Sequence, residues 1–209
     1  MTVAKIQPAK PITLYINFLS AWALRVYAAL LLANVEFELV EIDFKAKPEG
    51  YINEINQGGK VPALKYGDDL LIESAVITEF VAELFPEAKL LPETAFERAQ
   101  SRLVADRYSE LIQSVVGAYR ADKTAFAKFL PAVEKFIPYL KINPLANGVN
   151  QPLIGDILVA PLAAKLVDVL KEENNKTYSA SLASDSKYAT FNAWIEKLAA
   201  IPGVKGKVE

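Results

Sequence analysis

A proline set between two short apolar segments constrains the fold of this chain more than any other feature. Gly59-Lys60-Val61-Pro62 leads into Ala63-Leu64, and Leu70-Leu71-Ile72 follows a few residues later. Because proline cannot donate a hydrogen bond to a sheet, we expect Pro62 at the edge or first position of a strand, with a cis Val61-Pro62 bond making a sharp turn. We expect this turn to expose the backbone N–H and C=O of Val61 to a peptide ligand.

The two residues after this hairpin read as the start of a helix. Glu73-Ser74 follows the apolar run, and helical spacing then relates the next apolar residues, Val76, Ile77, Phe80, Val81 and Leu84. Ser74 is therefore expected to be the N-cap, and the helix start to favour an anion. Turn and helix start together suit a short peptide with two carboxylates.

The upstream half supplies an alternation of strands and helices. Ile12–Ile16 and Phe37–Asp43 read as strands, and Ser20–Asn34 reads as an apolar helix between them. Strand, helix, strand, helix, then a Val-Pro turn and a hairpin form a thioredoxin-like order. The sequence thus predicts an α/β thioredoxin-like domain over residues 1–85.

Downstream of a linker with two prolines, residues 85–92, the pattern is helical. We expect one long helix or two in series over Glu93–Ala121, further helices over Thr124–Leu140, Ile157–Lys171 and Asp185–Ala200, and a polar loop at 174–179. Residues 93–209 are therefore predicted to form an all-α C-terminal domain.

Composition excludes several functions. The 209 residues are 52% hydrophobic and 23% charged, with a net charge of −2 and no concentrated basic stripe, so we expect no nucleic-acid partner. The apolar runs fall short of the roughly 18 residues of a membrane span, so we expect no membrane partner and a cytoplasmic protein. The chain contains neither cysteine nor histidine, which excludes dithiol exchange and Cys/His metal sites, and we expect no metal. If the protein handles thiols, the sulfur must arrive with the ligand.

The run Ser20-Ala21-Trp22-Ala23-Leu24-Arg25-Val26 resembles the glutathione transferase superfamily. Omega-like members carry Cys-Pro-aromatic-Ala-x-Arg here, and zeta-like members carry a serine five residues before Arg-Val, as Ser20 stands before Arg25. The likeness extends through Val61-Pro62, Glu73-Ser74, Gly155-Asp156 and the stretch from Trp194 to Val204. It implies a serine-type transferase that conjugates the thiolate of glutathione, its co-substrate, to apolar electrophiles, and a homodimer.

The resemblance also implies roles for single residues. Ser20 is the expected catalytic hydroxyl, with Tyr15 as the alternative, and Arg25 is expected to support the fold. Val61 and Pro62 match the position that pairs with the cysteinyl part of glutathione, and Glu73 with Ser74 the pair that holds its γ-glutamyl end. Lys47 matches a lysine for the glycine carboxylate, with Lys45 and Lys60 as alternatives. An acceptor pocket between the domains is expected from the aromatic residues Phe18, Trp22, Tyr108 and Tyr119.

Two departures from the family pattern bear on function. Ser20 and Ala21 replace the Cys-Pro of omega-like members, which disfavours thiol transfer and keeps open a binding module without turnover. Leu153 replaces the usual Ser or Thr three residues before Asp156, so Asp156 is expected to be structural within an incomplete capping box.

Overall fold

The computed structural model describes residues 4–117, 119 and 123–208, which divide into two compact units. The first unit comprises Met1–Leu91 together with Pro202–Glu209, and the second comprises Pro92–Ile201. The last residues of the chain therefore group with the α/β unit, whereas the sequence assigned them to the helical one.

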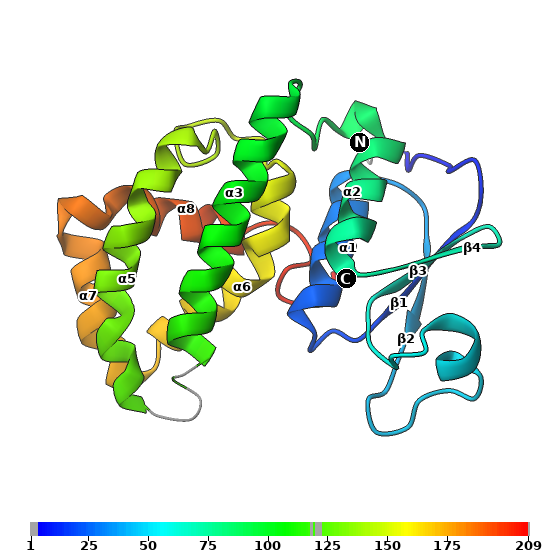
Figure 1. Ribbon diagram of the computed structural model, residues 1–209, viewed down its shortest axis with the longest axis horizontal. Helices are drawn as coiled ribbons and strands as arrows, with labels where there is room; N and C mark the ends of the chain where they lie inside the picture. Colours follow the sequence, from blue (N-terminus) through cyan, green and yellow to red (C-terminus); the bar gives the residue numbers. More distant parts are fainter. Residues whose placement is uncertain (1–3, 118, 120–122, 209) are drawn as a thin grey trace. The chain divides into compact units, whose positions relative to one another are not determined.

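The first unit is built on a four-stranded mixed sheet (Figure 1). Its strands β1 (Ile12–Ile16), β2 (Glu38–Glu41), β3 (Ala63–Tyr66) and β4 (Asp69–Ile72) lie in the order β2-β1-β3-β4. β1 runs parallel to β2 and antiparallel to β3, which in turn pairs antiparallel with β4. This is the expected thioredoxin-like arrangement, and it carries the end of β1 and the start of β3 side by side.

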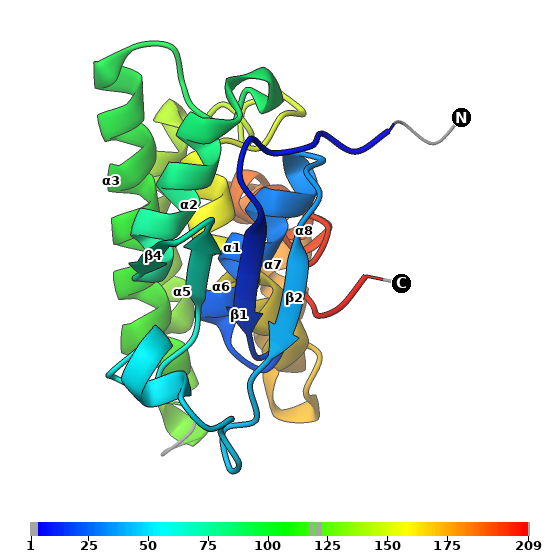
Figure 2. The same cartoon turned by 90° about the vertical axis from the view of Figure 1, so that its right-hand side faces the viewer.

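Helices α1 (Ala21–Leu32) and α2 (Ser74–Leu84) lie on the same face of this sheet (Figure 2). Alternation along β1 buries Leu14, whereas Tyr15 points to the opposite face. There the ring of Tyr15 contacts the ring of Tyr51 at 5.8 Å, in the π-helical turn Tyr51–Ile55. Both faces of β1 are thus covered, which fixes the ends of the strand that lead into the site.

The C-terminal segment joins the first unit through close contact with α1. Gly203 has a φ of 82°, and a Cβ there would lie 2.7 Å from Cδ1 of Tyr27 and 2.8 Å from Cδ1 of Leu31. The backbone N–H of Val208 also donates to the hydroxyl of Tyr27 at 3.2 Å. Only glycine allows both this conformation and this approach, which explains why the tail packs on α1.

The described part of the second unit contains the helices α3 (Ala95–Ile112), α5 (Phe129–Phe136), α6 (Ile154–Leu170), α7 (Lys176–Ser184) and α8 (Ala189–Ala199). Within the segment Glu93–Ala121, predicted as one helix or two in series, Ala95–Ile112 form α3 and Gln113–Gly117 continue as a π-helical turn, while its expected end lies outside the described residues. The polar loop expected at 174–179 was wrong, because α7 begins at Lys176. The ring of Tyr178 packs on Phe126 at 5.2 Å, a tertiary contact that outweighs the polar composition.

Helices α3 and α6 approach closely at Gly155. A Cβ on Gly155 would lie 2.2 Å from the carbonyl oxygen of Ser101, and the Gly155 N–H donates to the Ser101 hydroxyl at 3.0 Å. Next to it, the carboxylate of Asp156 accepts the N–H of Leu153 at 3.0 Å, while no side chain caps the helix from Leu153. Half of the capping box is thus present, as expected from the sequence.

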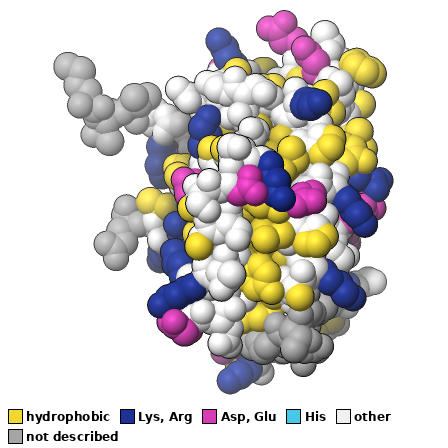
Figure 3. Space-filling view, turned by 90° about the vertical axis from the view of Figure 1, so that its left-hand side faces the viewer, with side chains coloured by type: hydrophobic (Ala, Val, Ile, Leu, Met, Phe, Trp, Pro, Cys, Tyr) yellow, Lys and Arg dark blue, Asp and Glu magenta, His cyan; other side chains and the backbone are white. Residues whose placement is uncertain are grey.

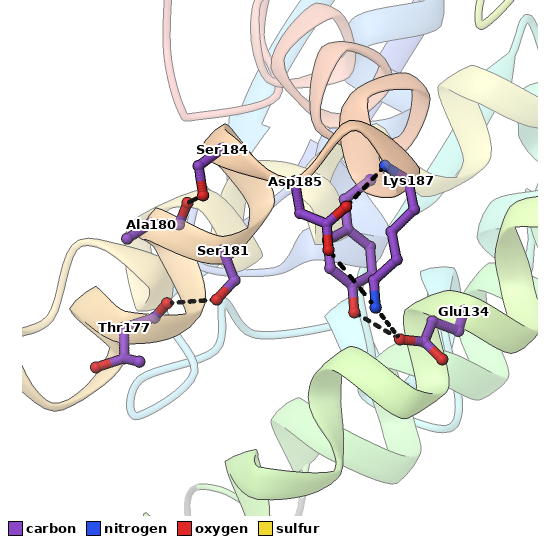
Figure 4. Close-up of polar contacts among 8 residues, drawn as sticks. Glu134, Thr177, Ala180, Ser181, Ser184, Asp185 and Lys187 are labelled. Carbon is purple, nitrogen blue, oxygen red and sulfur yellow. Dashed lines mark hydrogen bonds and ion pairs between the residues drawn. The ribbon is translucent and has the colours of Figure 1, made fainter.

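Charged side chains of both signs lie close together on the surface of the second unit. Lys187 lies 3.0 Å from Glu134 and 3.6 Å from Asp185, and the Tyr188 hydroxyl donates to Glu134 at 2.6 Å (Figure 4). Figure 3 shows Lys and Arg interspersed with Asp, Glu and apolar side chains on the face turned to the viewer. This face therefore carries no continuous basic stripe of the kind that binds nucleic acids.

Candidate functional site

A cavity of about 470 Å³ in the first unit is lined by half of the residues predicted for the site. Val61 and Pro62 line it before β3, and Glu73 and Ser74 line it at the start of α2. Its remaining walls are formed by Trp22, Arg25, Asn56, Lys60 and Ala75. Residues far apart in the sequence thus meet because β3 and β4 form a hairpin that returns the chain to α1.

The backbone of Val61 faces this cavity with its polar groups unused. The Val61-Pro62 bond is cis, as expected from the sequence. Within the described residues, no hydrogen bond uses the N–H or C=O of Val61. A free donor and acceptor on one residue are what an extended peptide needs to pair with a sheet edge.

The start of α2 differs from the expectation in one respect. Glu73, with a φ of 72°, is the N-cap, and Ser74 is the first helical residue, so the predicted N-cap role of Ser74 was wrong. A positive φ is uncommon outside glycine and marks a conformation held by its surroundings. It leaves the Glu73 side chain exposed beside the cavity and the Ser74 hydroxyl and N–H at its wall.

Arg25 forms a buried, positively charged part of the wall. Its side chain is 6% exposed, its guanidinium carbon lies 4.4 Å from the ring centre of Trp22, and Nη1 donates to the Ser74 hydroxyl at 3.5 Å. Burial lowers the pKa of Arg25 to about 10, so the group remains charged at neutral pH. Among the described residues it has no acidic partner.

Ser20 caps α1 close to this cavity without being part of its lining. Its Oγ accepts the N–H of Ala23 at 3.3 Å, and its own N–H donates to the carbonyl oxygen of Asn17 at 2.9 Å. A hydroxyl has one proton and two acceptor positions, and no hydrogen bond in the described residues uses the Ser20 proton. The serine is thus free to donate to a ligand at a helix N-terminus.

Lys47 lies on the Gly59 side of the same loop. Gly59 has a φ of 59°, and a Cβ there would lie 2.8 Å from Nζ of Lys47, so the ammonium group rests against the backbone two residues before Val61. Lys47 does not line the cavity, whereas Lys60, one of its sequence alternatives, does. The ammonium groups of Lys47 and Lys60 therefore remain alternatives for binding the second carboxylate of a peptide ligand.

Comparison with known proteins decides the family. Residues 10–83 match the glutathione S-transferase N-terminal domain. A probable glutathione S-transferase 5 of Caenorhabditis elegans is 31% identical over 160 residues, 72% of either chain. The structure of glutathione transferase Omega 1C from Trametes versicolor superposes with a TM-score of 0.77 at 30% identity, covering 93% of this chain and 89% of that one.

The chain belongs to the glutathione transferase superfamily. Its omega-like character is supported by a probable glutathione transferase omega-2 of Caenorhabditis briggsae, which is 27% identical over 88% of this chain and 75% of its own. The thioredoxin-like first unit and the helical second unit are those of a transferase.

The aromatic residues expected in an acceptor pocket of this transferase have unequal positions. Trp22 is 44% exposed and lines the cavity, and Phe18 packs edge-on against Tyr27 at 5.5 Å. Tyr108 is fully buried and Tyr119 nearly so, each within the core of the second unit. This corrects the expectation for the two tyrosines, because their rings pack against other core rings and do not face an open pocket.

A larger cavity, of about 600 Å³, lies between α3 and α5 of the transferase. It is lined by Leu111, Val115, Phe136 and their neighbours and contains none of the residues predicted for the site. Size alone therefore does not identify the site, whose polar groups converge on the smaller cavity. Among the described residues, no group of three or more acidic side chains is arranged to hold a metal ion, and no helix is long and apolar enough to cross a bilayer.

Sequence reasoning missed two asparagines that hold the site in place. The Asn56 amide donates to the Lys60 carbonyl at 2.9 Å and accepts the Gly58 N–H at 3.0 Å, closing the turn before Val61. The Asn17 amide donates to the Ile42 carbonyl at 2.8 Å and accepts the Leu19 N–H at 2.9 Å, which fixes the turn before Ser20. Asn followed by Gln-Gly-Gly was the available signal for the first.

Proposed function

We propose that this transferase binds glutathione along Val61 and activates its thiol with the hydroxyl of Ser20, for attack on apolar electrophiles. The observation that carries the proposal is the single cavity in which a backbone edge without partners at Val61 meets Glu73, Ser74 and a cation. At about 470 Å³ the cavity lies within the range of roughly 300–1,000 Å³ typical of small-ligand sites. The γ-glutamyl end of the tripeptide is assigned to Ser74, and its glycine carboxylate is assigned to Lys47.

The energetic demand on Ser20 is modest. Lowering a thiol pKa from about 8.5 to about 6.5 needs roughly 2.7 kcal/mol of preferential stabilisation of the thiolate. A hydrogen bond to a charged group contributes about 1.5–3 kcal/mol, and a helix N-terminus adds about 0.3–1 kcal/mol. One serine at the start of α1 therefore suffices, without a cysteine or a metal.

The experiment is a pH titration of the ultraviolet absorbance of the thiolate in the complex, together with turnover on a panel of aryl halides, epoxides and enones. We expect bound glutathione to ionise about two pH units below the free thiol. Binding without ionisation or turnover would contradict the proposal and favour the alternative of a binding module. The relatives that are named as glutathione transferases support the proposal of an enzyme over that of a binding module.

We also propose that the transferase acts in the cytoplasm, in detoxification, as a homodimer. Phe96 and Leu103, two turns apart on α3, are 72% and 40% exposed, and Ile72 and Val76 of the first unit are also exposed. A stable pair would bury on the order of 1,200–2,000 Å². Light scattering at micromolar concentration tests the proposal, and a mass of one chain would contradict it.

A further inference from the structure

The cavity between α3 and α5 combines an apolar floor with cations at its rim. Its apolar lining includes the core residues Leu111, Val115 and Phe136, together with Pro131 and Ala132. Its volume of about 600 Å³ falls within the range of roughly 300–1,000 Å³ that small-ligand sites occupy. The described residues that line it are all different from those that line the cavity of the first unit, so this cavity calls for a ligand of its own.

Two lysines of this cavity lack an acidic partner. Lys128 and Lys135 are exposed, and neither forms an ion pair with a described residue. Glu110 is the one carboxylate among the described lining residues, and it accepts from Arg107 at 2.7 Å, so these two charges offset each other. The lining therefore keeps a positive charge, which favours an anionic ligand.

The two lysines lie toward opposite ends of α5. Lys128 precedes the first residue of this helix, and Lys135 lies in its last turn. Seven residues make nearly two turns of an α-helix, so the two side chains start from the same side of α5, about 10 Å apart along its axis. Pro131 and Ala132 lie between them in the sequence and also line the cavity. The lining thus places an apolar surface between two cations.

This arrangement matches an elongated apolar molecule with an anionic group at each end. The apolar middle would lie on Phe136 and its neighbours, and each anion would meet one lysine. Tyr139 lines the cavity four residues after Lys135, and no hydrogen bond of the described residues uses its hydroxyl, which can donate to the same anion. A ligand with a single anion would leave one of the two ammonium groups without a partner.

We propose that the cavity between α3 and α5 binds an elongated apolar dianion whose two acidic groups pair with Lys128 and Lys135. This inference does not depend on the site proposed for glutathione. Because both lysines are exposed, each ion pair contributes little, and burial of the apolar middle supplies most of the affinity. The lysines therefore select among ligands of similar apolar area.

The test compares two ligands that differ in one charge. Biphenyl-4,4′-dicarboxylate is a rigid apolar rod with a carboxylate at each end, of a length close to the spacing of the lysines, and biphenyl-4-carboxylate is the same rod with one carboxylate. Calorimetry at low ionic strength should find that the dicarboxylate binds roughly 2- to 5-fold more tightly, although it is the less apolar of the two. Equal or tighter binding of the monocarboxylate, or no binding of either, would overturn the inference.

Substitution of the lysines gives a second signature. Lys128→Gln or Lys135→Gln should each raise the Kd of the dicarboxylate roughly 2- to 5-fold. Either change alone should leave the monocarboxylate almost unaffected, because its one anion can turn to the remaining lysine, and only the double variant should weaken it. Lys141→Gln removes an exposed lysine that does not line the cavity, and it should change neither Kd. An equal loss in this control would mean that net charge alone attracts the ligand, which overturns the pairing.

A variant that fills the cavity shows where the two ligands bind. Ala132→Phe adds a ring to the lining and should abolish binding of both, while circular dichroism and melting confirm that the fold is kept. Retained binding in this variant, or displacement of the ligands by saturating glutathione, would place them elsewhere and overturn the inference. The lysine variants, which alter only exposed side chains, decide the question if Ala132→Phe does not fold. Glutathione binding measured without these ligands tests the proposed function separately.

Discussion

The hydroxyl of Tyr51 donates a hydrogen bond to the carbonyl oxygen of Lys60 at 2.7 Å, and this bond fixes the residue before Val61 from across the loop. Burial raises the pKa of Tyr51 to about 12, so the phenol keeps its proton throughout the neutral range. The Asn56 amide donates to the same carbonyl at 2.9 Å. Two donors on one oxygen hold the peptide that precedes the free backbone edge.

We predict that Tyr51→Phe destabilises the protein by about 0.5–1.5 kcal/mol, the net contribution of one hydrogen bond, and weakens glutathione binding. The matched control is Tyr15→Phe, which keeps the ring contact with Tyr51 and removes a hydroxyl that no hydrogen bond of the described residues uses. Calorimetry and chemical denaturation measure both effects. Equal losses in the two variants would mean that the hydrogen bond from Tyr51 to Lys60 contributes nothing specific to stability or binding.

Ser20→Ala should reduce conjugation by roughly 10- to 100-fold with little effect on glutathione affinity, because its hydrogen bond strengthens only when the thiolate forms. The alanine variant also loses the N-cap hydrogen bond with the N–H of Ala23, which costs about 1 kcal/mol of stability, whereas glycine at an N-cap costs only a few tenths of a kcal/mol. Ser20→Gly, which keeps most of the helix stability, should therefore show the same loss of rate. Full activity in both variants would shift the role to Tyr15 or to backbone donors, and Ser20→Cys should introduce thiol transfer.

Ser74→Ala and Glu73→Gln should each weaken glutathione binding by about 1–3 kcal/mol, as expected when a bond to a charged group is lost. The substitutions act on opposite charges of one head group. Ser74→Ala removes a donor to the carboxylate, and Glu73→Gln removes the partner of the ammonium. Glu83→Ala, at an exposed position near the end of α2, is the control and should change nothing. Unchanged affinity in both site variants, measured by calorimetry, would disprove the assignment.

Local chemistry explains which parts of the site were predictable. Pro62 acts through its own ring, and Ser20 through a hydroxyl that accepts a backbone N–H three residues later, so the cis turn and the cap on α1 depend on neighbouring residues alone. The N-cap of α2 was placed one residue late, because Glu73 adopts a positive φ of 72° where the chain passes from β4 into α2. The sequence carries no sign of that backbone conformation.

Tertiary contacts determined the parts that could not be predicted. Arg25 read as a support for the fold, and only the packing of α1 against α2 shows it buried beside Ser74, with no acidic partner among the described residues. Tyr108 read as an aromatic residue available to a pocket, and its burial depends on Phe136, Phe191 and Trp194 from distant helices. Residues 93–209 were predicted as one helical domain, while the contact of Gly203 with Tyr27 brings the tail to the first unit.

Tyr108→Phe should stabilise the protein. The hydroxyl is fully buried and has no hydrogen-bond partner in the described residues, and burial raises the pKa of Tyr108. An unsatisfied buried polar group costs about 1–3 kcal/mol, so we expect a gain of about 1 kcal/mol. The control is Tyr119→Phe, because the Tyr119 hydroxyl donates to Glu172 at 2.8 Å and accepts from Asn175 at 3.1 Å, and this variant should be less stable. A loss of stability in Tyr108→Phe would indicate a bound water or an altered ring position.

Asp156 ties three segments of the second unit together. Its Oδ1 accepts from Asn143 at 2.8 Å and from the Trp194 indole at 3.1 Å, and its Oδ2 accepts from the Leu153 N–H. We predict that Asp156→Ala destabilises the protein by about 2–4 kcal/mol, because it leaves three donors buried without an acceptor. Asp156→Asn keeps an acceptor for Asn143 and Trp194, so it should lose about 1–2 kcal/mol.

Wild type and Asp156→Asn also test how the stability contributed by Asp156 depends on pH. Burial raises the pKa of Asp156, and its three hydrogen bonds only partly oppose this effect. Because the folded protein then holds this proton more tightly than the unfolded chain, the contribution of Asp156 to stability is greatest below the unfolded pKa of about 3.9. It falls as the pH rises through the raised pKa and stays constant above it. Urea denaturation of wild type and Asp156→Asn between pH 4 and 8 should therefore give a difference in stability that shrinks with rising pH. A difference that grows with pH would mean that the hydrogen bonds outweigh burial and that the pKa is lowered.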